Sequence, residues 1–279
     1  MVSTPTTTAP SGTLGSRLGP PRWLRHALPG VIGTLAILLI LEIAIRFNVI
    51  DNSYFPPPSL VIGRCAELLT DALFLRDVGT TAWATVVGLA VAMLISIPLG
   101  IIMGSSRIAY AASRGIVELL RPIPSVALIP LAILLYGGGL NMKVSLIVYA
   151  SVWPILFNAI YGAHDVEPLA KDTARSFGVN RLGTLWKVTL PHAAPFIATG
   201  VRVSAAIALV LAISAEFLAG GSGGLGSWML KVSSVSGETG LIFAGITIAG
   251  LMGLALNGLL ALVERRLFPW HHLMQEKNK

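Results

Sequence analysis

The stretch that decides the fold is Lys171–Pro191, KDTARSFGVNRLGTLWKVTLP, the longest strongly polar and basic interruption between the long apolar runs of this chain. Asp172–Phe177 predicts a short helix, because charged and small residues accompany Ala174 and Phe177, which are spaced to share one face. Gly178 follows at the position where a glycine commonly ends a helix. The stretch therefore begins with a compact helix that stops abruptly.

A second amphipathic piece completes the stretch. Within Leu182–Val188, the spacing allows Leu182, Leu185 and Trp186 to share one helical face. We expect this piece to end at Leu190-Pro191, because proline cannot continue the hydrogen-bond ladder of a helix. A helix, a glycine break and a second helix between two apolar spans form a protrusion that a partner can grip.

The stretch resembles the EAA loop of ATP-binding-cassette (ABC) importer permeases, whose pattern is E-A-A, three residues, glycine, nine residues and then I-x-L-P. The chain has Asp172-Thr173-Ala174, Gly178 and Val188-Thr189-Leu190-Pro191 at the same spacing. It departs in Asp for Glu, Thr for Ala and Val for Ile, and the first change keeps a carboxylate of shorter reach. The alternative is an ordinary amphipathic loop. The resemblance implies contact with a separate ATPase through Asp172, Thr173, Ala174, Arg175, Phe177, Gly178, Leu190 and Pro191.

The composition indicates a membrane protein. Of the 279 residues, 54% are hydrophobic and 12% are charged, and the mean hydropathy is +0.77. Apolar runs of about 20 residues recur without the two-residue alternation of barrel strands, which predicts an all-α, polytopic fold with about six transmembrane helices. Glu42 and Arg46 have helical i,i+4 spacing, and we favour an interfacial pair. The single cysteine, Cys65, excludes an intrachain disulfide.

The apolar runs divide the chain into tails, spans and loops. Six spans are expected, at about 28–47, 82–104, 118–137, 143–162, 193–218 and 240–263. Residues 1–27, rich in Ser, Thr, Pro and Gly, are expected to be a disordered cytoplasmic tail. The other segments are an extracytoplasmic segment with an amphipathic helix at 48–81, a permease core of five spans at 82–263 with its coupling loop at 163–192, and a cytoplasmic tail at 264–279.

The basic residues predict the orientation of the spans. With six spans both termini lie on one side, and that side carries 13 of the 20 Lys and Arg residues, against 5 on the other. Loops rich in Lys and Arg stay in the cytoplasm. We therefore expect both termini and the Lys171–Pro191 loop there, and the resemblance adds that the membrane is the bacterial inner membrane. The net charge of +7 is explained by these loops rather than by nucleic acid.

Prolines interrupt the third span, 118–137, which follows a short basic loop with Arg107 and Arg114. Broken helices are tolerated where protein or a water-filled cavity surrounds them, which favours a pore-lining position. Arg202 would attract an anion or pair with a carbonyl group, and Glu216 is expected at an outer gate or a binding-protein contact. The candidate translocation residues are Pro122, Pro124, Pro130, Asn158, Arg202, Ser204, Ser214 and Glu216.

Further motifs are similar to those of permeases in the nitrate, sulfonate and taurine importer group. They are Arg121-Pro122-Ile123-Pro124, Ala127–Leu131, Ala215-Glu216-Phe217 and Gly223–Gly226. The resemblance implies a permease homodimer in lipid, a cytoplasmic ABC ATPase dimer that holds ATP and Mg²⁺, and an extracytoplasmic solute-binding protein. It implies alternating access for a small anion such as a sulfonate, taurine or nitrate. Betaine, phosphonate, bicarbonate and a pyrimidine precursor remain open as cargo.

Several functions lack their signatures. The sequence has no GxxxxGK[ST], HExxH or C-x-x-C motif. We therefore expect no catalytic residue, no metal site, no cofactor bound by this chain and no nucleic-acid partner, with ATP hydrolysed on a separate subunit. His271-His272 is expected to be solvated. A secondary transporter or channel would need no ATPase, a membrane enzyme would need a catalytic cluster, and a structural scaffold would tolerate scrambling of Asp172–Pro191.

Overall fold

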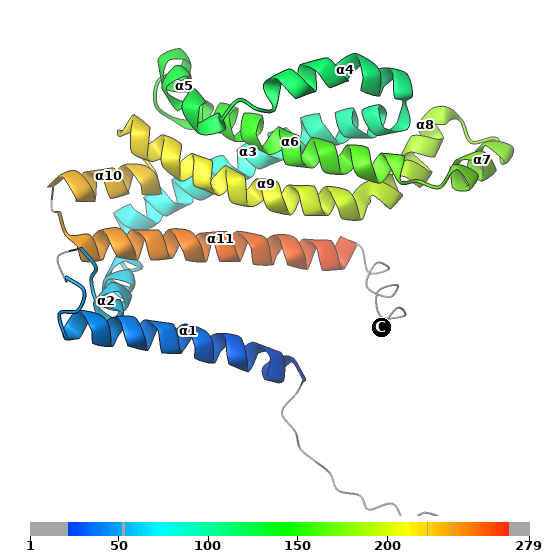
Figure 1. Cartoon of the computed structure of the whole chain (residues 1–279). Helices are drawn as coiled ribbons and strands as arrows, with labels where there is room; N and C mark the ends of the chain where they lie inside the picture. Colours follow the sequence, from blue (N-terminus) through cyan, green and yellow to red (C-terminus); the bar gives the residue numbers. More distant parts are fainter. Residues whose placement is uncertain (1–21, 52–53, 222, 236, 268–279) are drawn as a thin grey trace, which may run out of the picture. The chain divides into compact units, whose positions relative to one another are not determined.

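The computed structural model describes residues 22–51, 54–221, 223–235 and 237–267 (Figure 1). Within these ranges the chain forms helices and no strand, which confirms the all-α prediction. Most of the two expected tails, including His271-His272, lies outside the described residues. The chain divides into two compact units, residues 1–52 and 53–279.

The first unit contributes one helix. The part of α1 (Arg22–Arg46) that is apolar enough to cross a membrane is Pro29–Arg46, and the helix itself begins six residues before the expected span. The reason is that Arg, Leu and Ala residues before position 28 are good helix formers and extend the apolar helix. Arg46 Nε lies 2.7 Å from Glu42 Oε1, which confirms the expected i,i+4 pair.

The described residues contain five helices that are long and apolar enough to cross a membrane, or six if one bent pair counts as a span. This confirms the prediction of about six spans. The five are α1, α3 (Ala72–Ser105), α6 (Leu140–His164), the continuous helical stretch Arg181–Ala219, and α11 (Thr239–Leu267).

The bent pair replaces the expected third span. Its first arm is α4 (Arg107–Leu120), and its second is the 3₁₀ turn η1 (Ser125–Leu128) with α5 (Ile129–Tyr136), at 74° to each other. The prediction of a short basic loop before the span is wrong, because its arginines belong to α4. Ser106 caps this helix by accepting the Ala109 N–H, and local charge pairing supports it, since Arg114 lies 2.7 Å from Glu118.

Three long helices, α3, α6 and α9 (Leu190–Ala219), form the main packed core. Glycines allow their backbones to approach closely. A Cβ added at Gly104 of α3 would lie 2.5 Å from the Ile160 carbonyl oxygen of α6, and one added at Gly200 of α9 would lie 2.8 Å from the Pro154 carbonyl oxygen. Small residues at helix crossings are the usual basis of tight packing in membranes.

A second core joins the shorter helices at the opposite end of this unit from α7 and α8 (Figure 1). α2 (Pro58–Leu68), the helix expected within 48–81, packs with α10 (Leu225–Val235) and the start of α11. The rings of Phe74 and Trp228 meet edge to face, with centroids 4.7 Å apart. The sequence analysis did not anticipate α10, because the glycine-rich segment before it dominated that region.

Candidate functional site

The EAA-like stretch opens with α7 (Pro168–Ser176), which begins four residues before the predicted start. Pro168 occupies the first turn, where its missing N–H costs nothing, so the helix starts earlier than the charged residues suggested. The helix ends as predicted at Gly178, whose φ is +76°. The Gly178 and Val179 N–H groups donate to the Arg175 and Ala174 carbonyls at 2.9 and 3.1 Å.

The second piece differs from the prediction. α8 (Arg181–Thr184) passes into the π-helical turn η2 (Leu185–Thr189) and then into α9 without interruption. The expectation that Leu190-Pro191 ends the helix is therefore wrong. The Leu190 N–H donates to the Leu185 carbonyl, five residues back, and this wider turn accommodates the proline that follows it. Leu190 and Pro191 thus lie in the first turn of α9 rather than in a loop.

The stretch presents large apolar side chains to its surroundings. Phe177 is 83% exposed, Leu169 68%, Trp186 65% and Leu182 63%. Asp172 and Arg175 pair with each other at 3.3 Å, Thr173 is exposed, and Ala174 is half-buried. Exposed apolar side chains that are concentrated beside charged residues mark a protein interaction surface. The structure thus brings Asp172 to Gly178 together on one protruding element.

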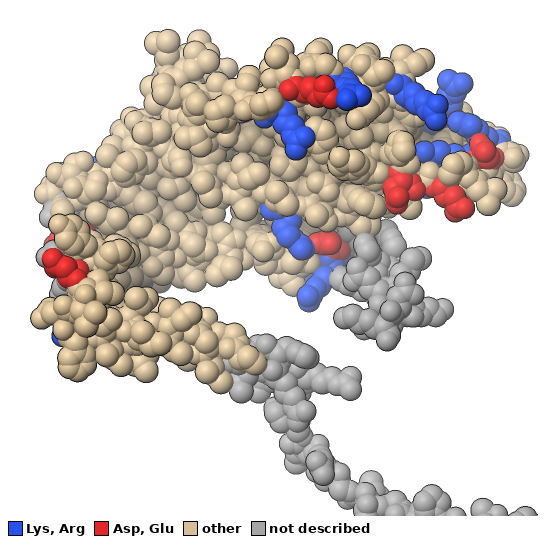
Figure 2. Space-filling model, in the orientation of Figure 1, with Lys and Arg blue, Asp and Glu red and all other residues tan. Residues whose placement is uncertain are grey.

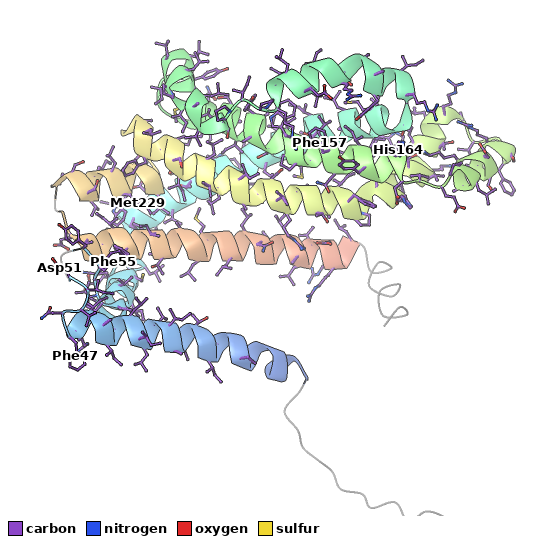
Figure 3. All side chains as sticks on the ribbon, in the orientation of Figure 1. Phe47, Asp51, Phe55, Phe157, His164 and Met229 are labelled. Atoms are coloured by element: carbon purple, nitrogen blue, oxygen red, sulfur yellow. The ribbon has the colours of Figure 1, made fainter. Side chains whose placement is uncertain are left out.

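Charge is concentrated around the same end of the second unit. Figure 2 shows Lys and Arg residues over the end that carries α7 and α8 and along α4, whereas other residues cover the middle of the bundle in this view. Phe157 lies on α6 where that helix passes α4 (Figure 3), and the Arg121 guanidinium lies 4.6 Å from its ring centroid. A basic end beside an apolar bundle is typical of a cytoplasmic membrane boundary.

The prolines of the candidate pathway lie on the bent pair. Pro122 and Pro124 occupy the break between α4 and η1, and both are exposed. Pro130 is also exposed but lies in the first turn of α5, so it does not interrupt a helix as expected. Tyr149 of α6 donates to the Leu120 carbonyl at 2.7 Å, at the end of α4. The break thus leaves a proline-rich segment exposed beside α6.

Three other pathway candidates make contacts within the bundle. Ser204 is fully buried and donates to the Ser151 carbonyl at 2.8 Å, which links α9 to α6. Asn158 donates to the Pro154 carbonyl of its own helix at 2.8 Å. Ser214 is half-buried on α9. Ser204 therefore links two helices, whereas the hydrogen bond of Asn158 stays within α6.

Arg202 pairs with a carboxylate rather than a carbonyl group. Its guanidinium forms an ion pair with Glu264 of α11. The side chain lines a cavity of about 630 Å³ between α9 and α11. Gly250 and Gly253 of α11 line the same cavity. The positive charge of Arg202 is therefore partly compensated by Glu264.

Glu216 lies in a buried polar cluster. It is 0% exposed, and its carboxylate lies 2.8 Å from the ammonium of Lys143, which is 1% exposed. The same carboxylate accepts hydrogen bonds from the Thr81 hydroxyl at 2.8 Å and the Gly226 N–H at 3.0 Å. Sequence analysis expected an outer gate or a binding-protein contact here. The structure instead encloses the carboxylate and joins α3, α6 and α9 through it.

The cluster also fixes the glycine-rich loop. Lys143 donates to the Gly223 carbonyl at 2.9 Å, and the Gly224 N–H donates to Asp77 at 2.9 Å. Gly224 has a φ of +110°, and a Cβ there would collide with the Glu216 carboxylate. The sequence places Lys143 at the start of the expected span 143–162. A lysine and a glutamate that both lie inside apolar spans were the available signal for a pair.

No group of three or more His, Cys, Asp and Glu side chains in the described ranges is arranged to hold a metal ion. His192 and Asp165 lie 3.3 Å apart at the basic end. Cys65 lies on α2, where burial raises the pKa of its thiol.

Comparison with known proteins identifies the family. The model of the family "binding-protein-dependent transport system inner membrane component" matches residues 96–269. The taurine transport system permease protein TauC of Escherichia coli is 31% identical over 91% of this chain and 94% of its own length. The nitrate import permease protein NrtB of Leptolyngbya laminosa is 27% identical over 94% of each chain.

The fold has a solved counterpart. The inward-facing MetNI methionine ABC transporter contains a chain that is 18% identical, with a TM-score of 0.62 over 70% of this chain and 95% of that chain. This likeness supports the arrangement of helices. Given the family match over residues 96–269 and the TauC similarity over nearly the whole chain, the protein belongs to the binding-protein-dependent transport system inner membrane components, the permease subunits of ABC importers.

Proposed function

We propose that two copies of this chain form the translocation pathway of an importer for a small anion of the sulfonate, taurine or nitrate kind. A cytoplasmic ATPase dimer holds ATP and Mg²⁺, and an extracytoplasmic binding protein delivers the cargo. The observation that carries the proposal is the protruding α7–Gly178 element, which combines the EAA spacing with exposed Phe177. The cargo class rests on the names of the taurine and nitrate permeases that this chain resembles.

The proposed mechanism is alternating access. ATP closes the ATPase dimer and displaces α7, whose helix follows α6 after a turn of three residues, Asp165–Glu167. The second piece of the stretch continues directly into α9, so both ends of the coupling loop are attached to core helices. Movement of α7 would therefore be transmitted to the bundle rather than absorbed by a flexible tether.

The proposed location is a bacterial inner membrane, with both termini in the cytoplasm. The charge asymmetry supports this orientation. One of the five cations assigned to the outer side, Lys143, is buried in an ion pair, which leaves four against 13 on the proposed cytoplasmic side. The basic end that carries α7 and α8 then faces the ATPase (Figure 2).

The test compares two exposed phenylalanines in the protein reconstituted with its ATPase and binding protein. Phe177→Ala removes the exposed ring that follows α7, and Phe47→Ala removes a ring that is 78% exposed in the turn directly after α1. An anchor residue of this kind contributes about 2 kcal/mol or more, which corresponds to roughly a thirtyfold loss of ATPase affinity. Cargo uptake and cargo-stimulated ATP hydrolysis should fall in Phe177→Ala alone. Equal uptake by both variants would contradict the proposal.

A further inference from the structure

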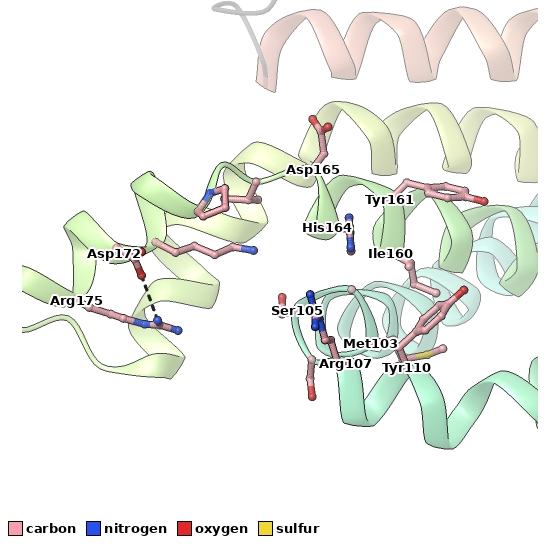
Figure 4. Close-up of a pocket in the computed structure, with 15 residues that line it drawn as sticks. Met103, Ser105, Arg107, Tyr110, Ile160, Tyr161, His164, Asp165, Asp172 and Arg175 are labelled. Atoms are coloured by element: carbon pink, nitrogen blue, oxygen red, sulfur yellow. Dashed lines mark hydrogen bonds and ion pairs between the residues drawn. The ribbon is translucent and has the colours of Figure 1, made fainter.

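Two adjoining hollows separate α7 from the bundle. The larger has a volume of about 810 Å³ and lies between the α3–α4 junction, the end of α6 and α7 (Figure 4). The smaller, of about 320 Å³, extends towards α8 and η2. Ser105, Ser106, Lys171 and Arg175 line both, so the two hollows share one wall. They form a single recess beside α7, with charged and hydroxyl side chains among its lining residues.

Cations from three elements surround this recess. Arg107 comes from α4, Lys171 and Arg175 from α7, and Arg181 from α8. Figure 4 shows Arg107 and His164 on opposite sides of the larger hollow. Positive groups held around one cavity repel each other and attract anions into it.

The internal carboxylates only partly neutralise these cations. Asp172 pairs with Arg175 at 3.3 Å, and Asp165 lies 3.3 Å from His192. Lys171 donates to the Ala163 carbonyl, again at 3.3 Å. Within the described ranges, Arg107 and Arg181 have no ion pair. Two guanidinium groups therefore remain available to an anion.

A buried hydroxyl points to the same recess. Thr189 lines the smaller hollow and is 1% exposed, yet its Oγ1 has no hydrogen-bond partner among the described residues. Buried polar groups are rarely left without a partner unless a ligand, ion or water completes them. α4 begins at Arg107, so the positive end of its helix dipole lies beside this guanidinium.

We propose that this recess binds a tetrahedral oxyanion of the phosphate type, either free in the cytosol or as the headgroup of an anionic phospholipid. Arginine side chains match such groups through charge-assisted, forked hydrogen bonds, and hydroxyl groups complete the shell. The outer wall of the larger hollow is apolar, with Met103, Ile160 and the two rings of Tyr110 and Tyr161. This wall suits the start of an acyl chain as well as an open mouth for a free ion.

Occupancy would connect α7 to α4. No residue of α7 is fully buried, and its Lys171 donates to the Ala163 carbonyl of α6. An anion that bridges Arg107 and Lys171 would hold the coupling helix against the bundle and alter its displacement by the ATPase. This consequence rests on the proposed function, whereas binding of the anion itself does not.

The test measures binding to the full-length chain without any ATPase. Calorimetric titration with sodium phosphate, in neutral detergent and at constant ionic strength set by sodium chloride, detects the free ion. Native mass spectrometry after exposure to vesicles of phosphatidylglycerol or phosphatidylcholine counts retained lipids. The variants are Arg107→Gln and Arg181→Gln. Arg114→Gln is the matched control, because Arg114 lies on α4 and pairs with Glu118.

The two measurements distinguish a site for free phosphate from a site for a lipid headgroup. Phosphate binding that weakens about tenfold in both variants, but not in the control, supports a site for the free ion. Retention of phosphatidylglycerol that only these two variants lose supports a headgroup site. Arg107→Lys keeps the positive charge and should therefore retain part of the anion binding that Arg107→Gln loses. If neither phosphate nor phosphatidylglycerol distinguishes them from Arg114→Gln, the proposal is overturned. Failure here would leave the Phe177 test of the proposed function unaffected.

Discussion

Replacing Lys143 by Met tests the buried cluster that Lys143 forms with Glu216. The change removes two contacts of the ammonium, at 2.8 Å to Glu216 and 2.9 Å to the Gly223 carbonyl. It leaves a carboxylate that is 0% exposed with neutral donors such as the Thr81 hydroxyl and the Gly226 N–H, and no ammonium beside it. Removing one partner of a buried ion pair costs about 3–5 kcal/mol, because the remaining charge is uncompensated.

The assay measures the apparent melting temperature in detergent. The readout is the loss of the monodisperse chromatographic peak after heating. A cost of this size corresponds to a drop of roughly 10 °C for a chain of this length. The matched control is Lys231→Met, since Lys231 is an exposed lysine on α10. The control should melt close to the unmodified protein, because an exposed lysine makes little net contribution to stability.

A double variant separates charge from packing. Lys143→Met combined with Glu216→Gln removes both charges and keeps an acceptor for Thr81 and Gly226. We expect it to melt above Lys143→Met alone, because the isolated buried charge is gone. A melting temperature of Lys143→Met equal to that of Lys231→Met would refute this prediction. So would a double variant whose melting temperature falls by the sum of the decreases in the two single variants.

Three further changes probe packing and reactivity. Gly104→Leu should prevent α3 from packing on α6, since the first added atom would lie 2.5 Å from the Ile160 carbonyl oxygen. The yield of folded protein should fall well below that of the control Gly115→Leu, because nothing lies within 4 Å of a Cβ at Gly115. Gly224→Ala should lower the melting temperature as far as Lys143→Met does, because its methyl group would displace the Glu216 carboxylate. A melting temperature within about a degree of that of the unmodified protein would contradict this. Burial raises the pKa of the Cys65 thiol, so its thiolate fraction at pH 7.5 is reduced. Iodoacetamide should label Cys65 more slowly than glutathione at that pH, and the labelling rate should increase as the pH rises. Labelling as fast as that of glutathione would contradict this prediction.

The end of α7 was predictable because its signal is local. Gly178 ends α7 with the positive φ that the C-cap position requires, and hydropathy located the long apolar helices. The continuation through Leu190-Pro191 was not predictable from the general rule on proline. It depends on a π-helical turn, which has no simple sequence signature.

Non-local contacts explain the other differences. Lys143 and Glu216 are 73 residues apart, and nothing in either neighbourhood specifies that they meet. Ser204 was selected as a polar residue in an apolar helix, yet its hydroxyl serves the Ser151 carbonyl of α6. Polar side chains within spans thus mark both pathways and helix contacts, and the packing of α6 on α9 distinguishes between them.

The contact between α6 and α9 runs from the coupling end to the buried cluster. Near the middle, Gly200 and the Ser204 hydroxyl hold α9 at close range to α6. At the far end, Lys143 and Glu216 join the same two helices. Closely packed helices shift against their neighbours more readily than they deform internally. A displacement of α7 is therefore expected to carry α6 and α9 together, so a Lys143→Met protein that folds and binds its ATPase should hydrolyse ATP with less cargo moved per turnover.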